Sequence, residues 1–136
     1  MWLEFEQAGM IIPSEEISCV EVFQINDDPR PYRLEIHLVD RGVEESLGLK
    51  YSDEKERQEM FSDIAKYVKL AEVDGVWVNV YAVSMIQKYK VTDDPNPYRF
   101  EVILKGMPIN SGIVSEFESE TERDKALKSF MRKRYE

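Results

Sequence analysis

Apolar and polar residues alternate along residues 17–25 and again along residues 32–38, which is the period of a β-strand with one face against a core. Between these segments lies Asp-Asp-Pro-Arg-Pro, residues 27–31. Proline cannot donate a hydrogen bond within a central strand, and aspartate favours turns through its own side chain. We therefore predict a β-hairpin whose loop contains this sequence, followed by a shorter strand near residues 46–51.

A helix is predicted after the short strand, because the apolar residues that follow have the spacing i, i+3, i+4. These residues are Met60, Phe61, Ile64, Ala65 and Val68. Asp53 lies three residues before Glu56, which is the pattern of a capping box at a helix start. The same signal recurs at Ser119 and Glu122, before a second set of apolar residues at helical spacing. Two capped helices are therefore expected.

The whole pattern recurs at one constant offset, which we call the repeat offset and which pairs Ile17 with Val83. Positions 17–38 align with positions 83–104, nine of the 22 positions are identical, and both segments contain Asp-Asp-Pro-x-Pro-Tyr-Arg-x-Glu. The alignment extends from residue 3 to residue 134 without a gap. Self-similarity at a fixed offset indicates a repeated structural unit. We interpret the chain as two tandem repeats, residues 1–69 and 70–136.

These predictions give an α+β fold. Each repeat is expected to be a small antiparallel β-meander of three to five strands, followed by one C-terminal helix packed on the sheet. A unit of this size buries too little surface to be stable alone, so the repeats should share a core or an interface in one pseudo-symmetric compact unit. The pattern leaves open whether they form one continuous sheet or pack face to face.

One face of each predicted sheet lies away from its helix, and we expect this outer face to be partly apolar. Its apolar residues and one histidine are Val20, Val22, His37, Val39, Ile86 and Ile103. An exposed apolar patch usually marks a contact surface. Two interpretations remain: the halves hide the patch between them, or it binds a second copy or a protein partner.

Charge is distributed unevenly along the 136 residues, whose net charge is −9. Residues 1–69 contain 8 basic and 16 acidic residues, whereas residues 70–136 contain 10 and 11. The acidic first half should repel nucleic acid. The cationic residues of the second half that could contact phosphates or an acidic protein are Lys88, Lys90, Arg99, Lys105, Lys125, Lys128 and Arg132. The alternatives are that the acidity serves solubility and that the basic residues of the last helix form a solvated face whose cations complement the helix dipole.

The predicted order of strands and helix resembles that of Pur-alpha-type and PC4/Whirly-type single-strand nucleic-acid binders. The resemblance concerns element order over most of each repeat and involves no sequence motif. It implies binding through a basic, aromatic-rich sheet, and the acidic first repeat departs from that composition.

Few residues suit catalysis or metal binding. His37 and Cys19 are the only histidine and cysteine, so no usual zinc site or intramolecular disulfide is expected. Cys19 should be a buried, unreactive thiol. The aspartate pairs Asp27-Asp28 and Asp93-Asp94 could bind a divalent cation or simply form the hairpin turns. We therefore expect no cofactor, no metal, no catalytic residue and no enzymatic activity.

The remaining expectations concern location and function. The acidic N-terminus does not have the form of a signal peptide, and no apolar run reaches the length of a membrane span. A cytoplasmic protein without membrane association is predicted. The leading hypothesis is a non-enzymatic interaction or structural module that self-associates, as a homo-oligomer, or binds a protein partner through its sheet. The alternative is single-stranded nucleic-acid binding by the cationic second repeat.

Overall fold

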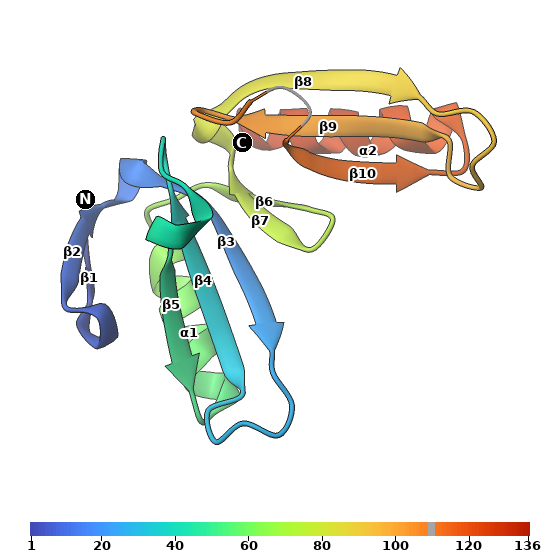
Figure 1. Cartoon of the computed structure of the whole chain (residues 1–136). Coiled ribbons are helices and arrows are strands. Elements are labelled where there is room, and N and C mark those ends of the chain that lie inside the picture. The colour runs from blue at the N-terminus through green and yellow to red at the C-terminus, as the bar shows by residue number, and fades with distance from the viewer. Residues whose placement is uncertain (109–110) are drawn as a thin grey trace.

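The computed structural model describes residues 1–108 and 111–136, and we refer to residues 1–69 and 70–136 as the first and second halves. The described chain is a compact α+β structure with two helices and antiparallel sheets of two, five and three strands. The predicted α+β class and antiparallel sheets are therefore confirmed. Figure 1 shows each helix lying across one face of a sheet, with a β-hairpin between the two halves.

The first half contains five strands, three 3-10 turns and one helix. Its strands are β1 (Trp2–Phe5), β2 (Met10–Pro13), β3 (Ile17–Gln24), β4 (Tyr32–Leu38) and β5 (Leu47–Tyr51). The short turns are Glu6–Ala8, Ser14–Glu16 and Val43–Glu45, and helix α1 is Glu54–Ala65. The predicted cap at the start of α1 is present, because the Asp53 side chain accepts a hydrogen bond from the backbone N–H of Lys55.

The strands and the helix of the second half follow each other in the same order as those of the first. Its strands are β6 (Leu70–Val73), β7 (Val76–Asn79), β8 (Val83–Lys90), β9 (Tyr98–Leu104) and β10 (Ile113–Phe117). A 3-10 turn covers Val80–Ala82, and helix α2 is Glu120–Lys133. Here too the predicted cap is present, since Ser119 accepts a hydrogen bond from the backbone N–H of Glu122.

The two halves are joined by strand pairing. The five-stranded sheet has the order β5-β4-β3-β7-β6, so the hairpin β6–β7 of the second half extends the sheet of the first. The register places Val20 opposite Trp77 and Cys19 opposite Val78. Strands β8, β9 and β10 form a separate sheet, and β1–β2 forms a two-stranded one. The halves therefore share one sheet in part.

The hairpin β6–β7 contributes to two hydrophobic cores, one on each of its faces. Leu70 and Trp77 pack into the first core, which also contains Ile64 of α1. Val73 and Val78 pack into the second core, which lies under α2. Because successive side chains of a strand point to opposite faces, one short hairpin can serve both cores.

The predicted faces of β3 need correction. The register between β3 and β4 shifts between Ile17 and Cys19, as at a β-bulge, and this reverses the phase of alternation. Ile17 and Val20 are both fully buried in the first core with α1, whereas Phe23 is 37% exposed. The sequence pattern places Val20 on the outer face, and this placement is wrong.

The ungapped alignment also fails near the N-terminus. β1 and β2 are connected by residues 6–9, whereas β6 and β7 are connected by Asp74 and Gly75 alone. Met10 pairs with Phe5 in the first hairpin, and Val76 pairs with Val73 in the second. Phe5 therefore corresponds to Val73 in the structure, whereas the repeat offset would align it with Ala71. The repeat offset therefore does not match the strand pairing of β1 with that of β6.

Candidate interaction surface

The N-terminal hairpin β1–β2 has one buried face and one bare face. Leu3, Phe5 and Ile12 point into the first core and are at most 7% exposed. Trp2 and Ile11, on the opposite face, are 68% and 61% exposed. Two large apolar side chains so close together on a solvent face are a candidate contact surface.

This hairpin is fixed to the rest of the first half. The Gln7 side chain bonds the backbone of Lys50 on β5 twice: it accepts from the N–H at 2.9 Å and donates to the carbonyl at 2.7 Å. The backbone N–H of Ser14 donates to the carbonyl of Met1 at 2.7 Å. In Figure 1 the hairpin lies beside β5. The bare face therefore has a defined position.

The hairpin β6–β7 shows what covers the corresponding face in the second half. Its Leu70 is 7% exposed, against 68% for Trp2. Trp77 contacts Phe61 of α1 edge to face, with ring centroids 5.2 Å apart. The Asn79 side chain donates to the carbonyl of Ile17 at 2.8 Å. The first half thus covers this face of β6–β7, whereas the face of β1–β2 is open to solvent.

A second open feature is the edge of β8. The sheet order is β10-β9-β8, so in the described part of the chain β8 has a strand partner on one side only. Met85 on this strand is 43% exposed, and Lys88 and Lys90 are also exposed. An unpaired strand edge presents backbone donors and acceptors to which another strand can add.

The outer-face residues named from the sequence are not brought together as a bare patch. Val20 and Ile103 are buried, at 0% and 1% exposure, because the first lies in a core and the second lies on β9, the central strand of the smaller sheet. Val22 and Ile86 are partly buried against the two cores. Neither Val20 nor Ile103 is therefore available to a partner in this structure.

The other two residues of that set have separate surroundings. His37 is partly buried, and its Nε2 lies 2.7 Å from a carboxylate oxygen of Glu21 on the neighbouring strand. Val39 lies at the wall of a groove between the halves. Sequence reasoning missed Trp2 and Ile11; the signal was the presence of large apolar residues in two short β-prone segments at the N-terminus.

The cationic residues of the second half are divided among several environments. Arg99 forms ion pairs with Asp94 and Glu116, at 3.0 and 3.1 Å. Lys88 lies 3.7 Å from Asp124. Lys90 lies over the ring of Tyr98. The exposed cations on α2 are Lys125, Lys128 and Arg132, whereas Lys105 faces the groove.

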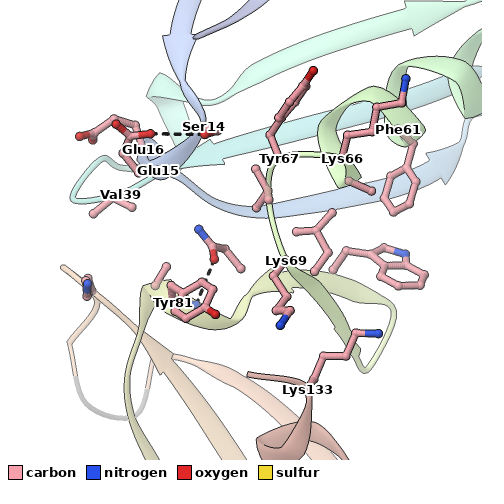
Figure 2. Close-up of a pocket in the computed structure, with 17 residues that line it drawn as sticks. Ser14, Glu15, Glu16, Val39, Phe61, Lys66, Tyr67, Lys69, Tyr81 and Lys133 are labelled. Carbon is pink, nitrogen blue, oxygen red and sulfur yellow. Dashed lines mark hydrogen bonds between the residues drawn. The ribbon is translucent and has the colours of Figure 1, made fainter. Parts of the chain in front are cut away.

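That groove lies between the two halves and has a volume of about 890 Å³. In Figure 2, Lys69 and Lys133 extend into the groove from opposite sides. The side chains of Lys66 and Tyr67 point away from these two lysines. The Lys69 ammonium donates to the backbone carbonyl of Glu136. The wall opposite is acidic, with Glu15 and Glu16. The groove is thus mixed in charge.

The aspartate pairs form turns and ion pairs. Asp28 accepts from the backbone N–H of Arg30 at 2.9 Å and pairs with Arg33 at 3.1 Å. Asp94 has the same two contacts, with the N–H of Asn96 and with Arg99. No group of three potential metal ligands occurs among residues 1–108 and 111–136. The carboxylates therefore have a structural explanation.

We expect Asp28 to contribute to the loss of folding stability at acid pH. The N–H of Arg30, and then the Arg33 guanidinium, hold the pKa of Asp28 below its ordinary value. The carboxylate therefore stabilises the fold above the unfolded-state pKa, and this contribution is lost as pH falls through the lower folded-state pKa. Urea unfolding of Asp28→Asn at several pH values should show less loss of stability on acidification than the wild type. An unchanged pH dependence would contradict this role.

Cys19 is expected to be unreactive in the folded protein. Its side chain is buried in the second core, where burial raises the pKa of the thiol to about 11. Thiolate is the reactive form, so little of it is present near neutral pH. A thiol-specific reagent should label the protein rapidly only after denaturant is added. Rapid labelling without denaturant would show that β7 does not cover Cys19.

In the described residues, no helix combines the length and the apolar character required to cross a bilayer. Comparison of the chain with protein-family models, curated proteins and solved structures finds no match.

Proposed function

We propose that the chain is a non-enzymatic interaction module that associates with itself or with a protein partner through exposed sheet surface and edges. The observation that supports this most is the bare face of the N-terminal hairpin. Trp2 and Ile11 are 68% and 61% exposed there, although the hairpin is fixed by Gln7. Burying such side chains against a partner would be favourable by roughly 1.5–3 kcal/mol each.

We further propose that the scaffold is a pseudo-symmetric tandem repeat with units 1–69 and 70–136. Several contacts recur at the repeat offset. Arg57 and Arg123 each lie over a tyrosine ring. Arg57 also donates to a backbone carbonyl of β3, and Arg123 donates to a backbone carbonyl of β8. Ser18 and Ser84 each donate to a carbonyl on the paired strand, at 3.1 Å in both cases. Repeated tertiary contacts of this kind support a shared origin of the halves.

A binding comparison tests the interaction function. Immobilised wild-type chain should capture free wild-type chain or a partner, and the variant Trp2→Asp/Ile11→Asp should capture much less. Both substituted side chains are exposed, so the variant should fold normally. Lys125→Asp/Lys128→Asp is the matched control, with two exposed residues of α2 changed. Equal capture by the wild type and the hairpin variant would exclude this surface.

The groove between the halves supports an alternative, single-stranded nucleic-acid binding. Lys69, Lys105 and Lys133 line it together with Trp77 and Tyr81. Lysines and aromatic rings in one groove are typical of such sites. An oligonucleotide should bind more tightly as salt falls, and Lys105→Glu/Lys133→Glu should bind more weakly. No binding at low salt would exclude this alternative.

A further inference from the structure

The contact between β7 and β3 provides a template for a second contact. β7 adds to the edge of β3 in antiparallel register, with Trp77 opposite Val20. Trp77 then reaches Phe61 of α1. This contact covers one face of the hairpin β6–β7 and the edge of β3 at the same time. Cys19 on that edge is 4% exposed.

The repeat offset identifies the residues that correspond to this template. It relates Trp77 to Ile11 on the N-terminal hairpin, and Val20 to Ile86 on β8. Phe61 of α1 corresponds to Leu127 of α2. Ile11 lies on the bare face of the hairpin, and Ile86 lies on the open edge strand. The chain therefore contains both surfaces of a second, unformed contact of the same kind.

The two surfaces do not meet within one chain. Gln7 fixes the N-terminal hairpin to Lys50 on β5, and Leu3 and Phe5 hold its other face in the first core. In Figure 1, β1 and β2 lie beside β5, far from β8 at the outer edge of the second half. Both surfaces can be covered without rearrangement only if they belong to different molecules.

We propose that the hairpin β1–β2 of one molecule adds to the β8 edge of a second copy. This inference rests on the proposed interaction function and names the partner. β2 would pair antiparallel with β8, with Ile11 opposite Ile86 and Ile12 opposite Met85. Trp2 and Ile11 would then cover the partner's sheet edge beside α2, as Leu70 and Trp77 do within the chain.

Charge supports this arrangement. The face that contains Trp2 and Ile11 also contains Glu4, and Glu6 begins the hairpin turn. β8 continues beyond the pairing segment into the exposed residues Lys88 and Lys90. In the proposed register the acidic turn reaches toward these lysines. Such complementarity favours the correct register and suppresses contacts between two hairpins or two β8 edges.

The contact is heterologous, because the hairpin and the β8 edge are different surfaces. Each molecule in a pair formed through one contact retains one open hairpin or one open edge. Heterologous contacts generate rings when the rotation closes and linear chains when it does not. A variant that is blocked at one surface should therefore retain the other.

Complementation between two blocked variants tests the proposal. Ile11→Asp removes the hairpin surface, and Met85→Asp places a charge on the β8 edge; both side chains are exposed, so both variants should fold. Each variant alone should be monomeric by light scattering. An equimolar mixture should form a heterodimer of twice the monomer mass, since one intact hairpin meets one intact edge. A mixture that remains monomeric would overturn the proposal.

Disulfide trapping gives a second measurement that checks the register. In a Cys19→Ala background, Ile11→Cys and Ile86→Cys chains are mixed under mild oxidation. Directly opposed strand residues have Cβ atoms about 4.5–5.5 Å apart, close enough for a disulfide after small adjustment. A mixed disulfide should form several-fold faster than between Ile11→Cys and the control Lys128→Cys. Equal rates would overturn the register.

The results also separate this inference from the function it rests on. Wild-type chain that associates, while the two blocked variants fail to complement each other, would contradict the hairpin-to-β8 contact alone. Wild-type chain that remains monomeric and captures no partner would contradict the interaction function as well. Complementation together with trapping would support both.

Discussion

Replacing Val20 with aspartate is expected to unfold the protein rather than only to weaken an interaction. Val20 is fully buried in the first core, where it packs with Ile64 of α1 and lies opposite Trp77 of β7. The substitution removes apolar burial and places a carboxylate without a partner in a dry core, which costs several kcal/mol. The free energy of unfolding of a whole domain is only about 5–15 kcal/mol. Circular dichroism during urea unfolding measures the loss.

Phe23→Asp is the matched control for this prediction. Phe23 lies on the same strand, three residues further along, but is 37% exposed. Its substitution should lower the free energy of unfolding far less, because the new carboxylate remains hydrated. Equal losses for Val20→Asp and Phe23→Asp would show that β3 does not have the faces described above.

Replacing Trp77 with alanine should lower the free energy of unfolding by about 2–4 kcal/mol. Trp77 packs into the first core from the second half and contacts Phe61 edge to face. Its loss removes apolar contact at the place where the two halves are joined. The reduced stability should be visible in both thermal and urea unfolding, monitored by circular dichroism.

Ile11→Ala provides the matched control, since the repeat offset relates Ile11 on the N-terminal hairpin to Trp77. Ile11 is 61% exposed, so in dilute solution its truncation should change stability by less than about 0.5 kcal/mol. The larger loss of stability for Trp77→Ala than for Ile11→Ala would follow because the hairpin β6–β7 is covered and the hairpin β1–β2 is exposed. Similar effects at both positions would contradict this difference.

Local sequence signals predicted the local structure well. Both helix starts were predicted from Asp53 and Ser119, because a capping side chain acts on the backbone within three residues. The hairpin loops followed from the Asp-Asp-Pro sequences, since proline and aspartate restrict the backbone where they occur. These signals work because each one acts within a few residues of its own position.

The faces of the strands could not be predicted with the same success. The irregularity between Ile17 and Cys19 changes the phase of β3, and no residue type there marks it. The burial of Val20 also depends on β7, a strand more than fifty residues away in sequence. Non-local pairing of this kind is invisible to a periodicity argument.

The candidate surface was missed for a related reason. Trp2 and Ile11 have the same apolar character as Leu70 and Trp77 in the corresponding hairpin. Only the structure shows that the first half covers one pair and that the other is bare. In the described residues, β7 pairs with β3 and Trp77 contacts Phe61, whereas β1 and β2 pair only with each other.

The molar mass of the wild-type chain as a function of concentration tests the central claim most directly. Light scattering after size-exclusion chromatography should give a mass above the 16.0 kDa of one chain, and the mass should increase with concentration. Ile11→Asp should remain at the monomer mass under the same conditions. A wild-type mass of 16.0 kDa at every concentration would contradict association through the hairpin and the β8 edge.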